Sequence, residues 1–182
     1  MTPFEIFIIA LIVLVIVLLA LELGILMYFL FSHVLPTLFL GAFFARSKDE
    51  TIKTMIRLVD IKPGEKALDL GSGDGALVIA LAKAGANVKG YEINPLLVLK
   101  SKKNIQNEGL NNKIFVSVKN FWLADLSEFD VITVFGIGYM MRRLEKKLKK
   151  ELKPGARIVS NYFTFPTWPP AKKEGIVYLY KK

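Results

Sequence analysis

The chain contains no cysteine and only one histidine, His33, among its 182 residues. The absence of cysteine excludes disulfides, thiol nucleophiles and cysteine-ligated zinc or iron–sulfur sites. A single histidine cannot build a His-rich metal centre, and it excludes most hydrolase triads that use an imidazole base. We therefore predict that the protein binds no metal.

Lysine and arginine are missing from the first 45 residues, which are mostly apolar. The apolar run from Phe4 to Phe31, which contains the acids Glu5 and Glu22, exceeds the ~20 residues that a membrane-spanning helix needs. It has no polar stripe, as a core helix would have, and no basic segment before it, as a signal peptide would have. We expect residues 1–35 to form a transmembrane anchor.

The rest of the chain is strongly basic, with all 25 basic residues against 14 acids, a net charge of +11. Basic residues that flank a span tend to stay in the cytoplasm, so we predict a single-pass protein with a cytoplasmic domain. Without a transit peptide, a bacterial or archaeal plasma membrane is expected. Anionic lipid accounts for the positive charge. Nucleic-acid binding is not expected, because it lacks aromatic or motif support.

A short apolar segment, Thr37–Ala45, follows a proline and is too short to span a membrane. We expect it to lie in the membrane interface or to cover part of the domain. Ser47 and Glu50 have the spacing of a capping box, which predicts the start of a helix. These features define an interfacial segment with a capping helix, residues 36–62, before an α/β domain, residues 63–182.

From Lys66 onward, strands alternate with helices, which is typical of a parallel sheet. This predicts a Rossmann-like α/β fold whose sheet has six to seven strands and helices on both faces. A seventh strand is not evident, and a proline-rich loop rather than a helix precedes the last strand. The predicted strands are Lys66–Leu70, Asn87–Ile93, Ile114–Val118, Asp130–Phe135, Ala156–Tyr162 and Gly175–Tyr180. The predicted helices are Gly75–Lys83, Pro95–Asn107 and Met140–Leu152.

The stretch ALDLGSGDGALVIALA contains a glycine-rich turn that can be read in two ways. Gly71, Gly73 and Ala76 fit the G-x-G-x-x-A turn of a dinucleotide site. Alternatively, Asp69 precedes Gly71, Gly73 and Gly75 and favours a ligand without phosphates. Asp69 would repel a pyrophosphate but would complement the sulfonium and ammonium of S-adenosylmethionine. The methyl donor is therefore favoured over a nicotinamide cofactor.

Further polar residues follow the second and third strands, at the edge where open α/β sheets bind ligands. Glu92 can accept both hydroxyls of an adenosine ribose, and Asn94 is placed to cap the next helix. The amide of Asn120 can read the adenine edge, and an adjacent aromatic ring can cover the adenine face. The predicted cofactor residues are Asp69, Gly71, Ser72, Gly73, Gly75, Glu92, Ile93, Asn94, Asn120 and Phe121.

The chain resembles the membrane-anchored class I protein-lysine N-methyltransferases that act on the ATP synthase c subunit and the adenine nucleotide translocase. The matching blocks cover most of residues 40–180: Asp69–Leu77, Gly90–Val98, Asn120–Trp122, Val134–Gly136 with Met140 and Met141, Leu144–Leu148, and Phe163–Trp168. The resemblance implies an N-methyltransferase that uses S-adenosylmethionine and modifies lysine in a membrane protein. Two departures are Asn120, where the family often has Asp, and Gly138-Tyr139 in place of Pro-Gln.

The candidate substrate rim consists of Phe135 and Tyr139 after the fourth strand, with Phe165 and Trp168 from the aromatic loop. Core packing is the alternative interpretation of that loop. No general base is evident in the sequence. Three other functions remain open: methylation of a lipid or small lipophilic amine, a non-catalytic scaffold that binds S-adenosylmethionine, and the disfavoured nicotinamide oxidoreductase.

Overall fold

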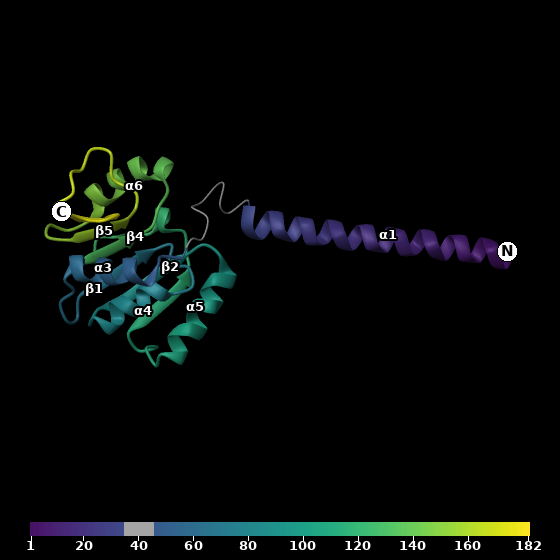
Figure 1. The fold of residues 1–182 in the computed structure, drawn as a ribbon, viewed down its shortest axis with the longest axis horizontal. Helices are drawn as coiled ribbons and strands as arrows, with labels where there is room; N and C mark the ends of the chain where they lie inside the picture. Colours follow the sequence, from purple (N-terminus) through teal and green to yellow (C-terminus); the bar gives the residue numbers. More distant parts are fainter. Residues whose placement is uncertain (35–45) are drawn as a thin grey trace. The chain divides into compact units, whose positions relative to one another are not determined.

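The computed structural model describes residues 1–34 and 46–182, and its contacts divide the chain into two compact units, Met1–Phe39 and Leu40–Lys182. The expectations for Pro36 and for Thr37–Ala45 lie outside the described residues. Each unit is described by itself (Figure 1).

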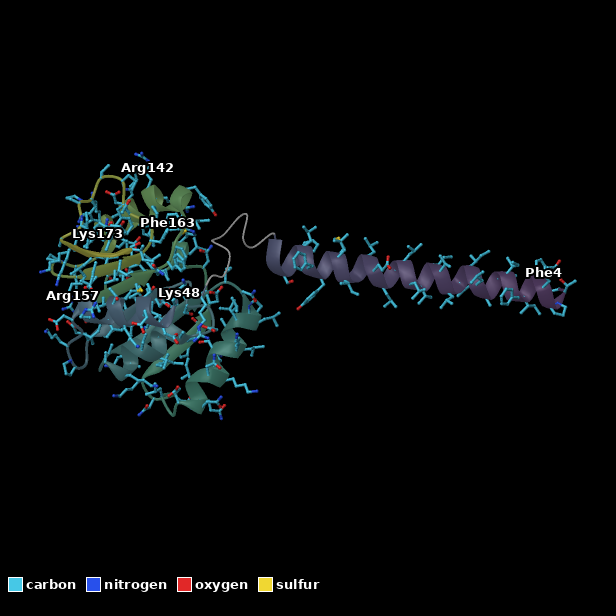
Figure 2. The ribbon with its side chains drawn as sticks, viewed as in Figure 1. Phe4, Lys48, Arg142, Arg157, Phe163 and Lys173 are labelled. Carbon is cyan, nitrogen blue, oxygen red and sulfur yellow. The ribbon has the colours of Figure 1, made fainter. Side chains whose placement is uncertain are left out.

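The first unit is dominated by one helix, α1 (Pro3–Phe29), which continues as a π-helical turn, Leu30–Val34. Its start is fixed by a capping box that was not among the sequence predictions, although Thr2 and Glu5 have its characteristic spacing. The Thr2 hydroxyl accepts the Glu5 N–H at 3.3 Å, and the Glu5 carboxylate accepts the Thr2 N–H at 2.8 Å. No α1 residue is buried, and its side chains project on all sides (Figure 2). By length and composition alone, Pro3–Ser32 is sufficient to cross a membrane.

The second unit is built on a seven-stranded sheet with the order β3-β2-β1-β4-β5-β7-β6. Five strands are parallel: β1 (Lys66–Leu70), β2 (Asn87–Glu92), β3 (Ile114–Val118), β4 (Val131–Val134) and β5 (Arg157–Asn161). The last two are antiparallel: β6 (Lys172–Glu174) and β7 (Val177–Lys181). The predicted α/β fold with a mostly parallel sheet is confirmed. The seventh strand that was not evident is β6, which is polar throughout and so carries no apolar pattern.

Helices cover both faces of this sheet (Figure 1). One face packs against α3 (Asp49–Val59), α4 (Ala76–Lys83) and α5 (Pro95–Asn107). The other packs against α6 (Gly138–Glu151) and the aromatic loop that precedes β6. Successive strand residues point to opposite faces, so neighbours such as Ala67 and Leu68 join different cores.

The capping box predicted for the first helix of the domain is wrong. The N-cap of α3 is Lys48, and it makes no side-chain capping bond. The Ser47 hydroxyl instead accepts a hydrogen bond from the Asn161 side-chain amide at 3.0 Å, and Glu50 pairs with Lys53. A tertiary partner at the end of β5 has therefore taken the hydroxyl that local geometry assigned to the helix.

The parallel strands give the sheet two chemically different edges. We call the edge where β1 to β5 end the carboxyl edge, and the edge where they begin the amino edge. From β1 the chain proceeds to β2 and β3 on one side and later to β4 and β5 on the other. The strand order therefore reverses between β1 and β4. Ligands of open α/β sheets bind in the crevice at such a point, outside the carboxyl ends of the strands.

Candidate functional site

The glycine-rich loop follows β1 at the carboxyl edge, next to the reversal in strand order. Gly71 and Gly75 have φ values of 85° and 89°, a left-handed conformation that side chains rarely adopt. A Cβ on Gly71 would meet no atom within 4 Å, so this side of the loop is open to a ligand. A Cβ on Gly75 would lie 2.3 Å from the Ser101 hydroxyl. Gly75 is thus required for packing against α5, and only Gly71 leaves room for a ligand.

Four of the five backbone N–H groups from Gly71 to Gly75 are already occupied within the protein. Those of Gly71 and Ser72 donate to the Tyr91 carbonyl at 2.8 and 3.1 Å, and that of Gly73 donates to the Glu92 carboxylate at 2.9 Å. The Gly75 N–H donates to the Ser72 carbonyl at 2.9 Å. A pyrophosphate cradle needs such groups free to face the ligand. This arrangement argues against the dinucleotide interpretation of the turn.

Glu92 ends β2 and is buried, with only 8% of its surface exposed. Besides the Gly73 N–H, it accepts the backbone N–H groups of Ile93 at 2.8 Å and Asn94 at 2.9 Å. A carboxylate has about four acceptor positions, so about one remains. Glu92 therefore fixes the glycine loop to the start of α5 and has capacity for one further donor, fewer than the two ribose hydroxyls predicted.

Asp69 lies in β1 and is also buried, with 4% of its surface exposed. The Thr133 hydroxyl donates to it at 2.7 Å from the neighbouring strand β4. Burial raises the pKa of Asp69 to about 7, the negative charge of Glu92 adds to this, and the Thr133 hydrogen bond opposes it. A ligand cation would stabilise the ionised form, because an opposite charge lowers the pKa of a carboxyl group.

A third buried acid, Asp74, lies in the same loop with 3% of its surface exposed. Its carboxylate is 3.3 Å from the guanidinium of Arg46 and 3.8 Å from the ammonium of Lys100. Sequence reasoning missed both Asp74 and Arg46. The available signals were an acid inside the glycine turn and the first basic residue after the long apolar run.

These residues surround a hollow of about 40 Å³ at the carboxyl edge. Its lining residues are Arg46, Ser47, Ile52, Asp69, Gly71, Ser72, Gly73, Asp74, Ala76, Leu77 and Phe135. The Ser72 hydroxyl is buried against Gly90 and has no hydrogen-bond partner within the described ranges. Ordinary ligand pockets measure about 300 to 1,000 Å³, so the hollow holds only part of a cofactor of that size.

The predicted residues after β2 and β3 serve backbone caps. Asn94 caps α5 as predicted, accepting the Leu96 N–H at 2.9 Å. The Asn120 carbonyl oxygen accepts the Trp122 N–H at 3.0 Å, which leaves its amide nitrogen for a ligand. The Phe121 ring is buried in the core, 4.8 Å from that of Trp122. None of these residues lines the hollow, and neither do Gly75, Glu92 and Ile93.

The four residues proposed for a substrate rim separate into two groups. Phe135 lines the hollow, and Tyr139 is 69% exposed at the start of α6. Phe165 is only 4% exposed, with its ring 4.7 Å from that of Tyr180, and Trp168 packs on both rings. The structure therefore places Phe165 and Trp168 in the packing against β7 rather than on an accessible rim, as the core interpretation of the loop expected.

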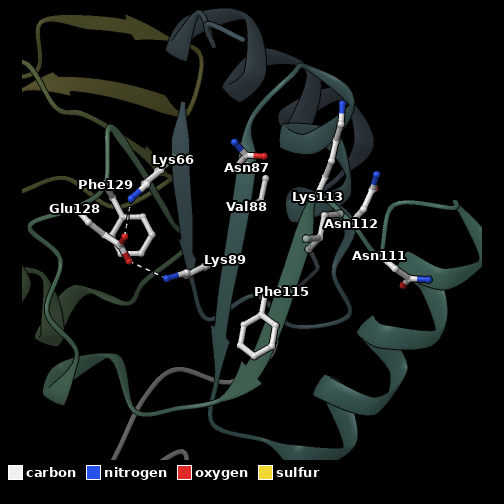
Figure 3. A pocket seen from close by; sticks show the side chains of 11 residues that line it. Lys66, Asn87, Val88, Lys89, Asn111, Asn112, Lys113, Phe115, Glu128 and Phe129 are labelled. Carbon is white, nitrogen blue, oxygen red and sulfur yellow. Dashed lines mark hydrogen bonds and ion pairs between the residues drawn. The ribbon is translucent and has the colours of Figure 1, made fainter. Parts of the chain in front are cut away.

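A larger pocket, of about 300 Å³, lies at the opposite, amino edge (Figure 3). Lys66 and Lys89 both pair there with Glu128, at 3.0 and 2.8 Å. Glu128 balances only one of these two lysines, and the exposed Lys113 also lines the pocket, so its lining carries a net positive charge. The pocket lies away from the carboxyl ends of the parallel strands, where open α/β sheets bind ligands, so we assign the functional site to the smaller hollow, which Asp69 and Asp74 line.

Residues 69–172, more than half of the chain, match the family model of the ANTKMT methyltransferase domain. The chain belongs to this family. The match begins at Asp69 and covers the glycine loop, Glu92 and the end of β4. The predicted resemblance to this methyltransferase family is thereby confirmed.

Three relatives are identical to the chain at about a third of the aligned positions. The rat lysine N-methyltransferase of the ATP synthase c subunit is 35% identical over 132 residues, which are 72% of this chain and 61% of the rat protein. A protein-lysine N-methyltransferase of Saccharolobus islandicus is 34% identical over 125 residues, 67% of this chain and 77% of that protein. The mouse adenine nucleotide translocase lysine N-methyltransferase is 35% identical, and the match covers 68% of this chain. The chain spans 54% of that mouse protein.

Solved structures confirm the class I methyltransferase fold. An RNA methyltransferase from Salinibacter ruber, in complex with S-adenosyl-L-homocysteine, matches with a TM-score of 0.73 and 30% identity. The match covers 75% of this chain and 93% of that one. The C-terminal domain of precorrin-6Y C5,15-methyltransferase from Rhodobacter capsulatus has a TM-score of 0.60 at 24% identity, which shows the fold alone.

Proposed function

We propose that this protein is a membrane-anchored, S-adenosylmethionine-dependent N-methyltransferase that modifies lysine in a membrane protein. The observation that carries the proposal is the chemistry of the glycine loop. Three buried acids surround it, and four of the five N–H groups from Gly71 to Gly75 have partners within the protein. Such a site favours a cationic ligand without phosphates.

The residues present fit S-adenosylmethionine, which supplies an electrophilic methyl group on a cationic sulfur. Asp69 would balance the positive charge of the cofactor, and the remaining acceptor position of Glu92 would take one ribose hydroxyl. The Asn120 amide nitrogen is available for the adenine edge. Binding by these residues positions the methyl group, and positioning provides most of the rate in such a transfer.

A lysine acceptor must lose a proton before it can attack, against an ordinary pKa of ~10.4. Phe135 lines the hollow, and Tyr139 is exposed after the same strand. Apolar rings around the acceptor amine would lower its pKa by desolvation. We assign no general base.

The anchor supports a membrane-protein substrate. Helix α1 covers about 40 Å at 1.5 Å per residue, more than the ~30 Å hydrocarbon core of a bilayer. Two relatives are named for a component of ATP synthase and for the adenine nucleotide translocase. We extend this substrate class to the present chain, with the domain on the cytoplasmic side of the plasma membrane.

RNA is a second candidate substrate. It is favoured by the match to the Salinibacter ruber enzyme and by the net charge of +11 after residue 45. A basic surface attracts phosphates without regard to sequence, so the charge is compatible with both RNA and anionic lipid.

Methyl transfer can be followed with S-adenosylmethionine labelled on its methyl group. The purified full-length protein is incubated with membranes and with RNA from a source strain that lacks the gene. Asp69→Asn is the test variant, and Glu128→Gln at the amino edge is the matched control. We expect label in a protein band, recovered as methyl-lysine, with the wild type and the control but not with Asp69→Asn.

Other distributions of the label contradict the proposal in different ways. Label confined to RNA establishes the second candidate, and label confined to the lipid extract indicates a lipid or lipophilic amine as acceptor. Cofactor binding without transfer to any fraction identifies a binding scaffold. Full activity of Asp69→Asn would overturn the assigned role of that carboxylate.

A further inference from the structure

The exposed apolar side chains of the domain gather at one edge of the sheet. Within residues 46–182, eight large apolar side chains are exposed. Seven of them lie at the carboxyl edge, and only Phe115, near the start of β3, lies elsewhere. We call these seven side chains the carboxyl rim. A uniform surface would not concentrate them in this way.

Four members of the rim follow β2 and β3. Leu96 and Leu99 lie in the first two turns of α5, and Val118 is the last residue of β3. Leu123 follows in a short 3-10 helix, with 85% of its surface exposed. Extended apolar patches on a soluble surface usually mark an interaction site.

Three members follow β4 and β5, on the other side of the glycine loop. Tyr139 is the second residue of α6 and is 69% exposed. Tyr162 follows the end of β5, and its N–H donates at 2.7 Å to the carbonyl of Ile176 in the turn between β6 and β7. The rim therefore flanks the cofactor hollow on both sides.

Exposed cations accompany the rim. Lys48, Lys119, Arg142 and Arg143 are exposed, and none of them forms an ion pair with another described residue (Figure 2 labels Lys48 and Arg142). Arg143 lies over the Trp122 ring at 4.3 Å instead. Apolar and aromatic groups interspersed with uncompensated cations are the composition of surfaces that bind anionic lipid.

We propose that the carboxyl rim docks on an anionic lipid surface, so that the cofactor hollow opens at the headgroup layer. This inference rests on the proposed function for its anchor. Arg46 at the hollow is joined to Val34 by residues 35–45, which at 3.3–3.6 Å each span at most about 40 Å. The anchor thus limits the distance of this edge from the bilayer. The acceptor lysine would then be one that lies at the lipid–water interface.

The absence of cysteine allows single-cysteine labelling of the full-length chain. Leu123→Cys reports on the rim, Phe115→Cys is the matched exposed apolar control, and Leu14→Cys reports on α1. Each variant is labelled with an environment-sensitive fluorophore and reconstituted into vesicles of phosphatidylcholine and phosphatidylglycerol. Lipids that carry a spin label near the headgroup or at mid-chain are then used as quenchers.

We expect the label at 123 to be quenched by the shallow spin label, the label at 115 to be unaffected, and the label at 14 to be quenched from mid-chain. Lys119→Gln and Arg142→Gln should each lower the ratio of docked to undocked domain about fivefold. Pure phosphatidylcholine should have the same effect as removing these cations.

Equal quenching at 123 and 115, or none at either, would overturn the docking proposal. A label at 123 that is shielded from a water-soluble quencher but not reached by spin-labelled lipid would show that a protein covers the rim, which also overturns it. Absence of quenching at 14 would instead refute the anchor and with it the proposed function. The label in α1 therefore separates the two failures.

Discussion

The amino and carboxyl edges of the same sheet differ in how they arrange charged and apolar side chains. The amino edge pairs its charges: Lys66 and Lys89 with Glu128, and Lys153 with Asp130. The carboxyl edge buries three acids around the glycine loop and exposes apolar side chains. Burial of an acid without a cation and exposure of apolar surface both cost stability. The difference shows that features suited to ligands lie at the carboxyl edge, whereas the amino edge holds ion pairs at its surface.

The largest expected contrast between the edges involves two glycines with positive φ. Gly75→Ala places a Cβ against Ser101 and strains the backbone, so we expect a loss of about 3 kcal/mol in the free energy of unfolding. Gly109, after α5, has a φ of 67° and no atom within 4 Å of the added Cβ. Gly109→Ala should lose about 1–2 kcal/mol. Denaturant unfolding measures both, and equal losses would show that contact with Ser101 is unimportant.

Two glutamates give the next contrast. Glu92→Gln weakens three hydrogen bonds from backbone N–H groups, so we expect a loss of about 2 kcal/mol in stability and at least about tenfold in cofactor affinity. Glu128→Gln disrupts exposed ion pairs and should cost at most about 1 kcal/mol, with cofactor affinity unchanged. Calorimetric titration with S-adenosylmethionine and denaturant unfolding provide the two readouts. A similar affinity of Glu92→Gln and Glu128→Gln for S-adenosylmethionine would contradict the assignment of Glu92 to the cofactor site.

The contributions of two aspartates, Asp69 and Asp130, to stability should change with pH in opposite directions. The folded pKa of Asp69, about 7, exceeds that of an unfolded aspartate, ~3.9. The stability that the protonated Asp69 carboxyl contributes is therefore fully present below pH ~4 and is lost as the pH rises towards 7. At Asp130, burial raises the pKa, but hydrogen bonds from Lys153 and the Lys66 backbone outweigh burial and lower it. Its contribution is present above pH ~4 and is lost in more acidic solution.

Stability measured against pH checks these signs. In the wild type, ionisation of Asp69 should lower the free energy of unfolding by up to about 4 kcal/mol between pH 4 and 7, and Asp69→Asn should remove this decrease. Affinity for the cationic cofactor should rise with pH up to about 7 and then level off, because the ionised carboxylate binds it. Asp130→Asn should leave that affinity profile unchanged. A pH-independent affinity in the wild type would exclude Asp69 as the partner of the positive charge.

The smallest effect on stability is expected at the exposed apolar positions. Leu123→Ser and Phe115→Ser change side chains that are 85% and 64% exposed, so each should alter the free energy of unfolding by less than about 0.5 kcal/mol. They should still differ in vesicle binding, which only Leu123→Ser reduces. A large loss of stability for Leu123→Ser would indicate a role in folding rather than in docking.

Elements with a strong local signal were predicted from the sequence within two residues. The bounds of β1, β3 and α5 match the prediction, because short apolar runs and the Asn94-Pro95 cap define them locally. Strand β6 was missed because its three polar residues are ordered only by pairing with β7. The capping role predicted for Ser47 was wrong for a similar reason, since the Asn161 side-chain amide donates to the same hydroxyl.

The candidate site was predictable in part. The glycine turn and the acids at positions 69 and 92 stand out because their spacing places them at strand ends. The pairing of Arg46 with Asp74 could not be found, since they are 28 residues apart and only the fold brings their side chains together. Phe165 illustrates the converse: an aromatic residue in a loop looks accessible in sequence, and its burial against Tyr180 follows from the position of β7.

The sequence by itself determined the elements, the apolar helix and the preference for a cofactor without phosphates. These follow from local periodicity, run length and the sign of one charge next to a glycine turn. Only the tertiary structure decided how each acid is used, which aromatic rings are buried and at which edge the exposed apolar side chains gather. Those outcomes depend on contacts between segments distant in sequence. These contacts decide which groups form hydrogen bonds with one another and which side chains are buried.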